Sequence, residues 1–377
     1  MLIAITMFFP ILRSTAFAFF ARKSRCLSSL RATIEHVDDD DDDVSVDLPQ
    51  LLDPKTMTNG IIPAPKSLSP SAVMEFKNCP QSYLFQYLWG LRQPTSLALA
   101  KGSMCHEALE KVFDLEPDDR SLETLQNLFR VSWGKHRTTD TYRILFEPKE
   151  GEWDIEGEKT WGKSGLELLE NYYNMEDPSQ IVRPNPVKRE MWVRSDLSVD
   201  PSVGFTATGK PSPSNTPTFH VRGIVDRLDM YKSPVDNQVA LRIVDYKTGK
   251  APNLKYSQAM NDKILTETFY QLKIYALLLR QNNADQLEGL DLRMLRLLFL
   301  TSETGPGQYL DMDLGATNQE RDALLNEIHV DLSDVWTRIN ALVETQDPKA
   351  FVGCNRSFCY CHKCRPRFLP LSLWEPK

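Results

Sequence analysis

Two apolar segments in the middle of the chain constrain its fold more than any other feature. Residues 219–231 and 239–247 are rich in β-branched and aromatic residues, and the seven residues between them have turn chemistry. A short turn between two strands joins antiparallel neighbours, so we expect a β-hairpin centred near Val235 and Asp236. This hairpin predicts a sheet that carries charged side chains near the end of a buried strand.

The predicted hairpin places two carboxylates opposite each other. Asp226 and Asp245 lie almost symmetrically about the centre of the turn, so their side chains face one another on neighbouring strands. Like charges in this position destabilise a sheet unless a partner neutralises them. Carboxylate oxygens are the ligands that Mg²⁺ and Mn²⁺ prefer, so the pair predicts a site for one of these cations.

A lysine completes this candidate site. Side chains alternate along a strand, so Asp245 and Lys247 point to one face and Tyr246 to the other. A cation held by two carboxylates polarises a phosphodiester and lowers the pKa of a bound water, and Lys247 can orient that water or stabilise the transition state. The same Asp-x-Lys tripeptide also fits a surface hairpin with ordinary salt bridges.

The segments around the hairpin alternate between helical and strand patterns. Ser69 and Pro70 form a helix start, with serine as N-cap and proline at the first helical position. Further helices are expected at Gly102–Phe113, Leu122–Trp133, Trp161–Tyr173, 257–282 and 317–344, and further strands at Leu292–Thr301 and Gln308–Leu314. Residues 196–218 have the composition of a loop. We therefore expect an α/β or α+β core with a helical N-terminal part.

The net charge of −7 excludes a nucleic-acid interaction driven by a global positive field. Residues 1–53 hold five Lys or Arg against nine Asp or Glu, so −4 of this charge belongs to them and −3 to the rest. The unbroken acidic run Asp38–Asp43 resists packing, and residues 34–65 are interpreted as a disordered linker. Contact with nucleic acid must then use a local groove or a divalent metal.

The first 33 residues are interpreted as a targeting presequence. Leu2–Leu12 is an apolar run too short to span a bilayer with ease, and residues 13–33 are basic, serine-rich and free of acids. This order resembles the bipartite plastid presequence of diatoms and related algae, with cleavage between Ala16 and Phe17. A plain secretory signal or a mitochondrial presequence is the alternative, and no stable membrane association is expected of the mature protein.

Five short motifs in order resemble those of RecB-like exonucleases of the PD-(D/E)XK nuclease superfamily. The central two are Gly-Ile-Val-Asp-Arg-Leu-Asp at 223–229 and Ile-Val-Asp-Tyr-Lys-Thr-Gly at 243–249. They follow a serine helix ending in Cys-Pro at 71–80 and a Gly-x-x-x-His motif at 102–106, and they precede a Gln-x-x-x-Tyr motif at 271–275. The resemblance implies a restriction-endonuclease-like core, with a mixed central sheet flanked by helices, over residues 66–377.

The resemblance also implies roles for individual residues. It makes Asp226, Asp245 and His106 the ligands of Mg²⁺ or Mn²⁺ and Lys247 the catalytic lysine. Gln271 and Tyr275 stand four residues apart on one face of a helix, where they support the site. Glu190 resembles the acidic residue that often precedes the core aspartate.

Four cysteines near the C-terminus resemble the iron–sulfur staple of several RecB-like nucleases, in which one upstream cysteine joins three others. Cys79 is the natural upstream partner, and Cys359, Cys361 and Cys364 are favoured over Cys354 for compactness. The spacing departs from the usual pattern, because a Cys-x-Cys occurs and no cysteine follows Cys364. A zinc site built from the four tail cysteines, or with His362, is the alternative to a [4Fe–4S] cluster.

The resemblance predicts a metal-dependent nuclease, more specifically an exonuclease acting on single-stranded or free-ended DNA in an organelle. An inactive nucleic-acid-binding module and an RNA-directed nuclease are the alternatives, since catalysis at a phosphodiester does not itself read the sugar. The sequence contains no Walker-type phosphate-binding motif, so a helicase would have to be a separate partner.

Overall fold

The computed structural model describes residues 61–147, 149, 151–180, 188–203, 217–233, 236–282, 286–287, 289–301, 307–362 and 364. The expected presequence, nearly all of the expected linker and the centre of the hairpin turn at Val235 lie outside these residues. Ile62, which the sequence interpretation placed in the linker, is buried and its N–H donates to Gln346 Oε1 at 2.9 Å. The packed chain therefore begins earlier than residue 66.

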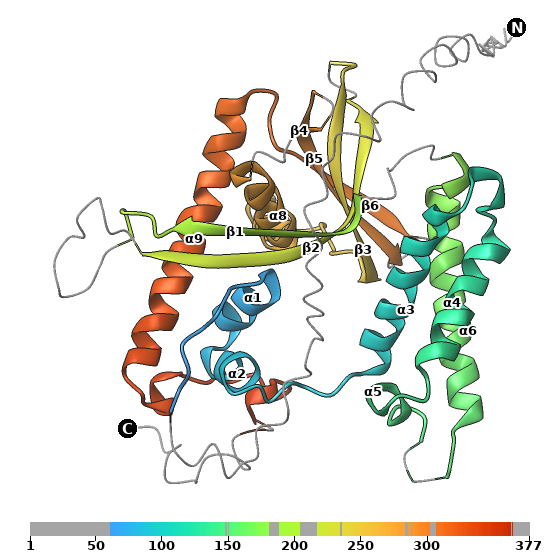
Figure 1. Ribbon diagram of the computed structural model, residues 1–377, viewed down its shortest axis with the longest axis horizontal. Helices are drawn as coiled ribbons and strands as arrows, with labels where there is room; N and C mark the ends of the chain where they lie inside the picture. The colour runs from blue at the N-terminus through green and yellow to red at the C-terminus, as the bar shows by residue number, and fades with distance from the viewer. Residues whose placement is uncertain are drawn as a thin grey trace, which may run out of the picture. The chain divides into compact units, whose positions relative to one another are not determined.

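A six-stranded mixed sheet forms the centre of the molecule (Figure 1). Its strands are β1 (Arg189–Ser198), β2 (Thr218–Lys232), β3 (Val239–Lys250), β4 (Gln286–Leu287), β5 (Leu290–Thr301) and β6 (Gln308–Asp313). The order is β1-β2-β3-β5-β4, and β6 also pairs with β5. Only the β3–β5 pair is parallel among the described ladders; the others are antiparallel. The α/β fold with a mixed sheet is confirmed.

The described helices divide into an N-terminal group and a C-terminal group. The first comprises α1 (Pro70–Asn78), α2 (Pro80–Tyr83), a π-helix (Leu84–Leu88), α3 (Leu97–Lys111), α4 (Leu122–His136), α5 (Asp140–Arg143) and α6 (Ile155–Met175). The second comprises α7 (Gln258–Thr268), α8 (Tyr270–Gln281) and α9 (Asn318–Glu344). Single 3₁₀ turns occur at Val112–Asp114, Pro117–Asp119, Pro178–Gln180 and Pro348–Ala350. The predicted helical N-terminal part is confirmed.

Helices cover both faces of the sheet (Figure 1). On one face α8 contacts β1, β2, β3 and β5, with α9 and α1 packed beyond it. On the other face α3 contacts β3 and α6 contacts β5, and α4 packs on both helices. Two apolar cores result, one on each side, and Ile243 belongs to the first while Val244 and Tyr246 belong to the second. Strand β3 is thus buried on both faces.

Helix starts follow the expected capping chemistry. Ser69 Oγ accepts the N–H of Ala72 at 3.2 Å, and Pro70 occupies the first helical position of α1, as predicted. Thr317 and Glu320 form a capping box at the start of α9. Side-chain acceptors at these positions satisfy backbone N–H groups that a helix end leaves without partners.

Two sequence expectations were wrong in detail. The helix expected over 257–282 is two helices, because Phe269 between them is completely buried and has a non-helical backbone (φ −87°, ψ 0°). The loop expected over 196–218 contains the last residues of β1 and the first of β2, and its residues 204–216 lie outside the described part. Strand β1 escaped detection because Val193 and Leu197 are its only fully buried residues.

Candidate active site and cysteine cluster

Three neighbouring strands each contribute one carboxylate to the candidate site. The β2–β3 ladder ends at Arg227 opposite Val244, and Asp226 and Asp245 directly follow this last pair on the two strands. In the β1–β2 ladder Arg189 pairs with Arg227 and Met191 with Val225, which places Glu190 opposite Asp226. The pairing of β1, β2 and β3 thus brings Glu190, Asp226 and Asp245 to neighbouring positions on the three strands.

A histidine from α3 joins this row. His106 Nδ1 lies 3.4 Å from Asp226 Oδ2, and His106 Nε2 lies 3.0 Å from the carbonyl oxygen of Tyr246. One ligand atom each of His106, Glu190 and Asp226 lies within 4.8 Å of the other two. The expected ligand set paired His106 and Asp226 with Asp245; the structure instead brings Glu190 into this group. The Asp245 carboxylate turns toward Lys247.

Burial and mutual repulsion raise the pKa of the clustered carboxyl groups. Burial, reinforced by the Asp245 carboxylate, raises the pKa of Asp226 to about 6. Burial, reinforced by the carboxylates of Asp226 and Glu110, raises the pKa of Glu190 to about 8. Carboxylates crowded in this way favour a bound cation, which relieves both effects.

Glu190 also has an uncommon backbone conformation, with φ of 44°. A side chain bearing a Cβ is disfavoured in this left-handed region, and such strain accumulates at functional sites. The strained residue is the one that brings its carboxylate next to Asp226.

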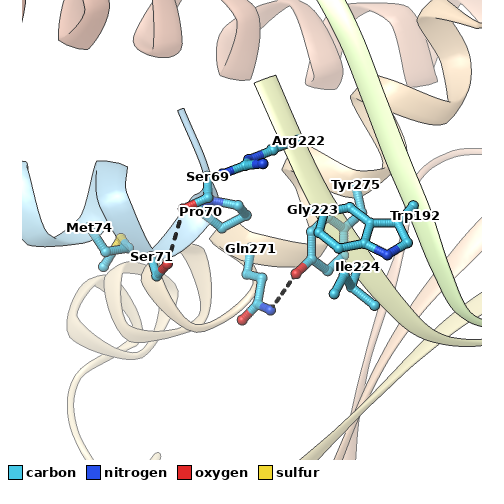
Figure 2. Close-up of a pocket in the computed structure, with 10 residues that line it drawn as sticks. All are labelled: Ser69, Pro70, Ser71, Met74, Trp192, Arg222, Gly223, Ile224, Gln271 and Tyr275. Carbon is cyan, nitrogen blue, oxygen red and sulfur yellow. Dashed lines mark hydrogen bonds between the residues drawn. The ribbon is translucent and has the colours of Figure 1, made fainter. Parts of the chain in front are cut away.

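The catalytic lysine expected from the sequence sits between two polar groups. Lys247 Nζ lies 2.6 Å from Asp245 Oδ2 and donates to Gln271 Oε1 at 3.0 Å. Gln271 Nε2 in turn donates to the hydroxyl of Tyr275 at 2.7 Å (Figure 2). Gln271 and Tyr275 come from α8, so this helix helps to orient the lysine.

A glycine allows α8 to approach the strand that carries Asp226. A Cβ built on Gly223 would overlap the ring of Tyr275. Gly223 pairs with Val193 of β1, three residues before Asp226. The glycine of the central motif therefore has a packing reason: it leaves room for the tyrosine that supports Gln271.

Sequence reasoning missed the structural role of Tyr246 and Arg227. The Tyr246 N–H donates to Asp226 Oδ2 at 2.9 Å, and its hydroxyl accepts from Arg227 Nη1 at 2.7 Å. Arg227 is completely buried and also donates to Asp229 and Glu176, both at 2.8 Å. This buried network holds β2 and β3 together behind the carboxylates. Its signal in the sequence was the Asp-Arg-Leu-Asp run at 226–229.

Two hollows open beside the site. One of about 380 Å³ is lined by residues from the start of α1, from β1 and β2, and by Gln271 and Tyr275 (Figure 2). The other, of about 450 Å³, is lined by residues of α3 with Glu190 and Thr248, and His106 is among them. Gln271 and Tyr275, which orient Lys247, therefore border the first hollow, and His106 and Glu190 border the second.

The residues fit Mg²⁺ or Mn²⁺. The Oδ2 atom of Asp245 is buried and, among the residues that the structure describes, has no hydrogen-bond donor in favourable geometry; its neighbour is the Lys247 ammonium. His106, Glu190 and Asp226 supply one nitrogen and two carboxylate ligands whose atoms lie within 4.8 Å of one another, and the charge of the nearby Asp245 carboxylate acts on both Asp226 and Glu190.

A second group of ligand atoms lies at the cysteines. The Sγ atoms of Cys79, Cys354, Cys359 and Cys361 all lie within 4.8 Å of one another. Both Cys354 N–H and Ser82 N–H donate to Cys79 Sγ at 3.4 Å. The sequence favoured Cys364 over Cys354, whereas the structure brings Cys354 into this close group, because the chain at Cys354 folds back onto Cys79; Cys364 is buried and is not one of the four.

The surroundings of the cysteine group favour the thiolate form of Cys354. Burial opposes ionisation of Cys354, but hydrogen bonds from Arg356 outweigh it and lower the pKa of Cys354 to about 6. Burial raises the pKa of Cys79. His362 lies outside the group, and its Nε2 is 3.1 Å from the carbonyl oxygen of Cys354.

The fold and the site together define a phosphodiesterase-type arrangement: a mixed sheet that presents carboxylates and a lysine at the end of a buried strand. The family model of the PD-(D/E)XK nuclease superfamily matches residues 67–366. The chain therefore belongs to the PD-(D/E)XK nuclease superfamily. Members of this superfamily are generally metal-dependent nucleases that use Mg²⁺ or Mn²⁺. A search of curated proteins found no match.

Proposed function

We propose that this protein is a RecB-like, metal-dependent exonuclease that hydrolyses single-stranded or free-ended DNA. The observation that carries the proposal is the row Glu190, Asp226 and Asp245 across three strands, with Lys247 beside it. An inactive relative that only binds nucleic acid would have no need for the raised carboxyl pKa values or for an oriented lysine.

The chain's own residues have distinct parts in this proposed reaction. A bound Mg²⁺ or Mn²⁺ would supply Lewis-acid chemistry at the phosphodiester. His106, Glu190, Asp226 and Asp245 would hold the cation, and the Tyr246 N–H keeps the Asp226 carboxylate in place. Lys247, oriented by Asp245 and Gln271, presents its Nζ protons to the attacking water or to the charge that develops on the phosphate.

End-labelled linear and circular single-stranded DNA, incubated with the purified protein and Mg²⁺, Mn²⁺ or EDTA, test this proposal. We expect the linear strand to be shortened from its ends in either metal, the circle to persist, and EDTA to abolish the reaction. Cutting of the circle would replace the exonuclease with an endonuclease. Binding without hydrolysis would make the chain an inactive module, and preferential digestion of matched RNA would make it an RNA-directed nuclease.

We further propose a [4Fe–4S] cluster on Cys79, Cys354, Cys359 and Cys361. Four thiols within 4.8 Å of one another support it, as does the mostly buried setting, since three of them are buried. Anaerobically purified protein should be brown and contain iron and sulfide. Colourless protein with one zinc per chain would assign the structural zinc alternative.

We propose delivery to the plastid, where the protein would act in organellar DNA repair or recombination with a separate helicase. The support is the acid-free, basic composition after the apolar run in residues 1–33, which lie outside the described residues. Among the described residues, no helix is long and apolar enough to cross a membrane. A fluorescent fusion of residues 1–35 in a diatom tests this, and an exclusively mitochondrial signal would refute it.

A further inference from the structure

An exposed strip of aromatic and basic side chains runs along β1 and β2. It consists of Trp192 opposite Ile224 and Arg194 opposite Arg222. Directly opposed residues of antiparallel strands point to the same face, and residues two apart on one strand share it. Trp192 is 61% exposed, an unusual degree for the largest side chain, and both arginines are exposed. We call these four residues the Trp192–Arg222 strip.

The two arginines face each other without a neutralising acid. Among the residues that the structure describes, neither guanidinium takes part in an ion pair or a side-chain hydrogen bond. Elsewhere on the sheet arginines are paired, as Arg293 is with Asp236 and Arg296 with Asp311, both at 2.6 Å. The next acid along β1, Asp196, is paired with His220 at 3.0 Å.

Two opposed arginines without an acidic partner among the described residues indicate an anionic ligand. Like charges directly opposite each other destabilise a sheet, and an anion between them removes the repulsion. Guanidinium groups match phosphate oxygens with two parallel hydrogen bonds. The chain has a net charge of −7, and these two arginines without an acidic partner give one face a local positive charge.

The strip leads to the candidate active site. Trp192, Arg222 and Ile224 line the same hollow as Gln271 and Tyr275, as Figure 2 shows. Gln271 accepts the hydrogen bond of Lys247 at 3.0 Å. Arg222 precedes Asp226 by four residues of β2, about 13 Å at about 3.3 Å per residue. A polymer that contacts the strip therefore reaches the carboxylates within a few of its units.

We propose that the Trp192–Arg222 strip is the binding path for single-stranded DNA approaching the active site. One phosphate lies between Arg194 and Arg222, and one base stacks on the indole of Trp192. A single strand fits because its bases are free to stack on an aromatic side chain, whereas those of a duplex already stack on one another. This inference rests on the proposed nuclease function and adds where its substrate is held.

Binding of a fluorescent oligothymidylate to the full chain in EDTA tests the path without cleavage. Trp192→Ala should weaken binding about 5- to 150-fold, and Trp192→Phe should retain most of the affinity, because stacking needs an aromatic face. The double variant Arg194→Ala/Arg222→Ala should lower the slope of log affinity against log salt by about 0.7, the value for one neutralised phosphate on a single strand. Arg194→Lys and Arg222→Lys should each keep most of the salt dependence of the unsubstituted protein.

Arg130→Ala is the matched control, because Arg130 is an exposed arginine of α4 whose partner is Asn127. It should leave both affinity and salt slope unchanged. Affinities of the Trp192 and arginine variants equal to that of the unsubstituted protein would overturn the path. Equal loss of duplex and single-strand binding in Trp192→Ala would overturn the stacking role.

The two proposals fail separately. Hydrolysis is measured on the unsubstituted protein with Mg²⁺, whereas strand binding is measured in EDTA. If the protein binds single strands through the strip but hydrolyses none, the nuclease proposal is overturned and the binding path is retained. If the protein hydrolyses DNA but the strip variants bind it as well as the unsubstituted protein does, the binding path is overturned and the nuclease proposal is retained.

Discussion

The ammonium of Lys247 lies 2.6 Å from the Oδ2 atom of Asp245, two residues earlier on the same strand. Lys247→Ala and Asp245→Asn should each lower the rate of DNA hydrolysis on the order of 10²-fold or more, because each removes a positioned charge from the reacting centre. Single-turnover rates in Mg²⁺ measure this, with circular dichroism as a check on folding. Near-normal rates in either variant would favour the inactive-module alternative.

Gly223→Ala should disturb the site through α8. The added methyl overlaps the ring of Tyr275, and overpacking of this kind costs about 1–3 kcal/mol of stability. The displaced tyrosine loses its 2.7 Å hydrogen bond with Gln271, so activity should fall as well. The double variant Gly223→Ala/Tyr275→Leu should regain stability in urea denaturation without regaining activity. Full activity of Gly223→Ala would show that the overlap is relieved elsewhere.

Metal affinity should rise with pH through two steps. A cation competes with protons for the carboxylates, and the pKa values of Asp226 and Glu190 are raised to about 6 and about 8. Calorimetric titration with Mn²⁺ between pH 5 and 9 measures both steps. Glu190→Gln should remove the upper step and keep the lower one. An upper step that persists in this variant belongs to another group.

The metal-free protein should lose stability over the same range. Because the pKa of Glu190 is higher in the folded protein than its ordinary value of 4.5, the folded state binds more protons between about pH 4.5 and 8. Stability therefore falls as pH rises through this window. Thermal melting in EDTA should show the fall, Glu190→Gln should reduce it, and saturating Mg²⁺ should reverse it.

The cysteine variants should separate into two groups. Cys79→Ser and Cys354→Ser should each lower the content of bound metal and the melting temperature, since both thiols belong to the close group of four. Cys364→Ser should leave the metal content unchanged, because Cys364 lies outside it. Metal analysis of the three proteins measures this. Loss of metal in Cys79→Ser and Cys364→Ser, with Cys354→Ser unaffected, would restore the set expected from the sequence.

Glu158 should stabilise the N-terminal helices only when ionised. Burial opposes its charge, but hydrogen bonds from Arg137, Trp133 and Trp153, at 2.6 to 2.7 Å, outweigh burial and lower its pKa. Its contribution is therefore present above about pH 4.5 and is lost as pH falls. Glu158→Gln should cost about 1–3 kcal/mol at pH 7 in urea denaturation and much less near pH 3. A pH-independent difference would contradict the charge-based account.

Local patterns predicted the part of the site that lies on the hairpin. Asp226 and Asp245 could be set opposite each other because a short turn fixes the register of two strands by symmetry, and the ladder through Arg227 and Val244 has that register. The strand expected over Gln308–Leu314 is also present as β6, where it pairs antiparallel with the preceding strand β5.

Features that depend on tertiary packing were not predictable in this way. The place of Glu190 beside Asp226 depends on a left-handed backbone and on pairing across a long connection. The choice of Cys354 over Cys364 depends on how the chain folds back after α9 onto Cys79, which spacing does not record. The complete burial of Arg227 also depends on tertiary contacts, among them its hydrogen bond to the Tyr246 hydroxyl.

The cysteine group lies on both sides of the catalytic segment in the sequence, with Cys79 before it and the other three members after it. A ribosome completes His106, Asp226, Lys247 and Tyr275 well before it reaches Cys354. A polypeptide that stops short of residue 354 thus contains every proposed catalytic residue and only one of the four thiols. Only chains that extend past the tail cysteines would then bind metal at this group. Shorter chains would lack this stabilisation and would be degraded more readily by quality-control proteases.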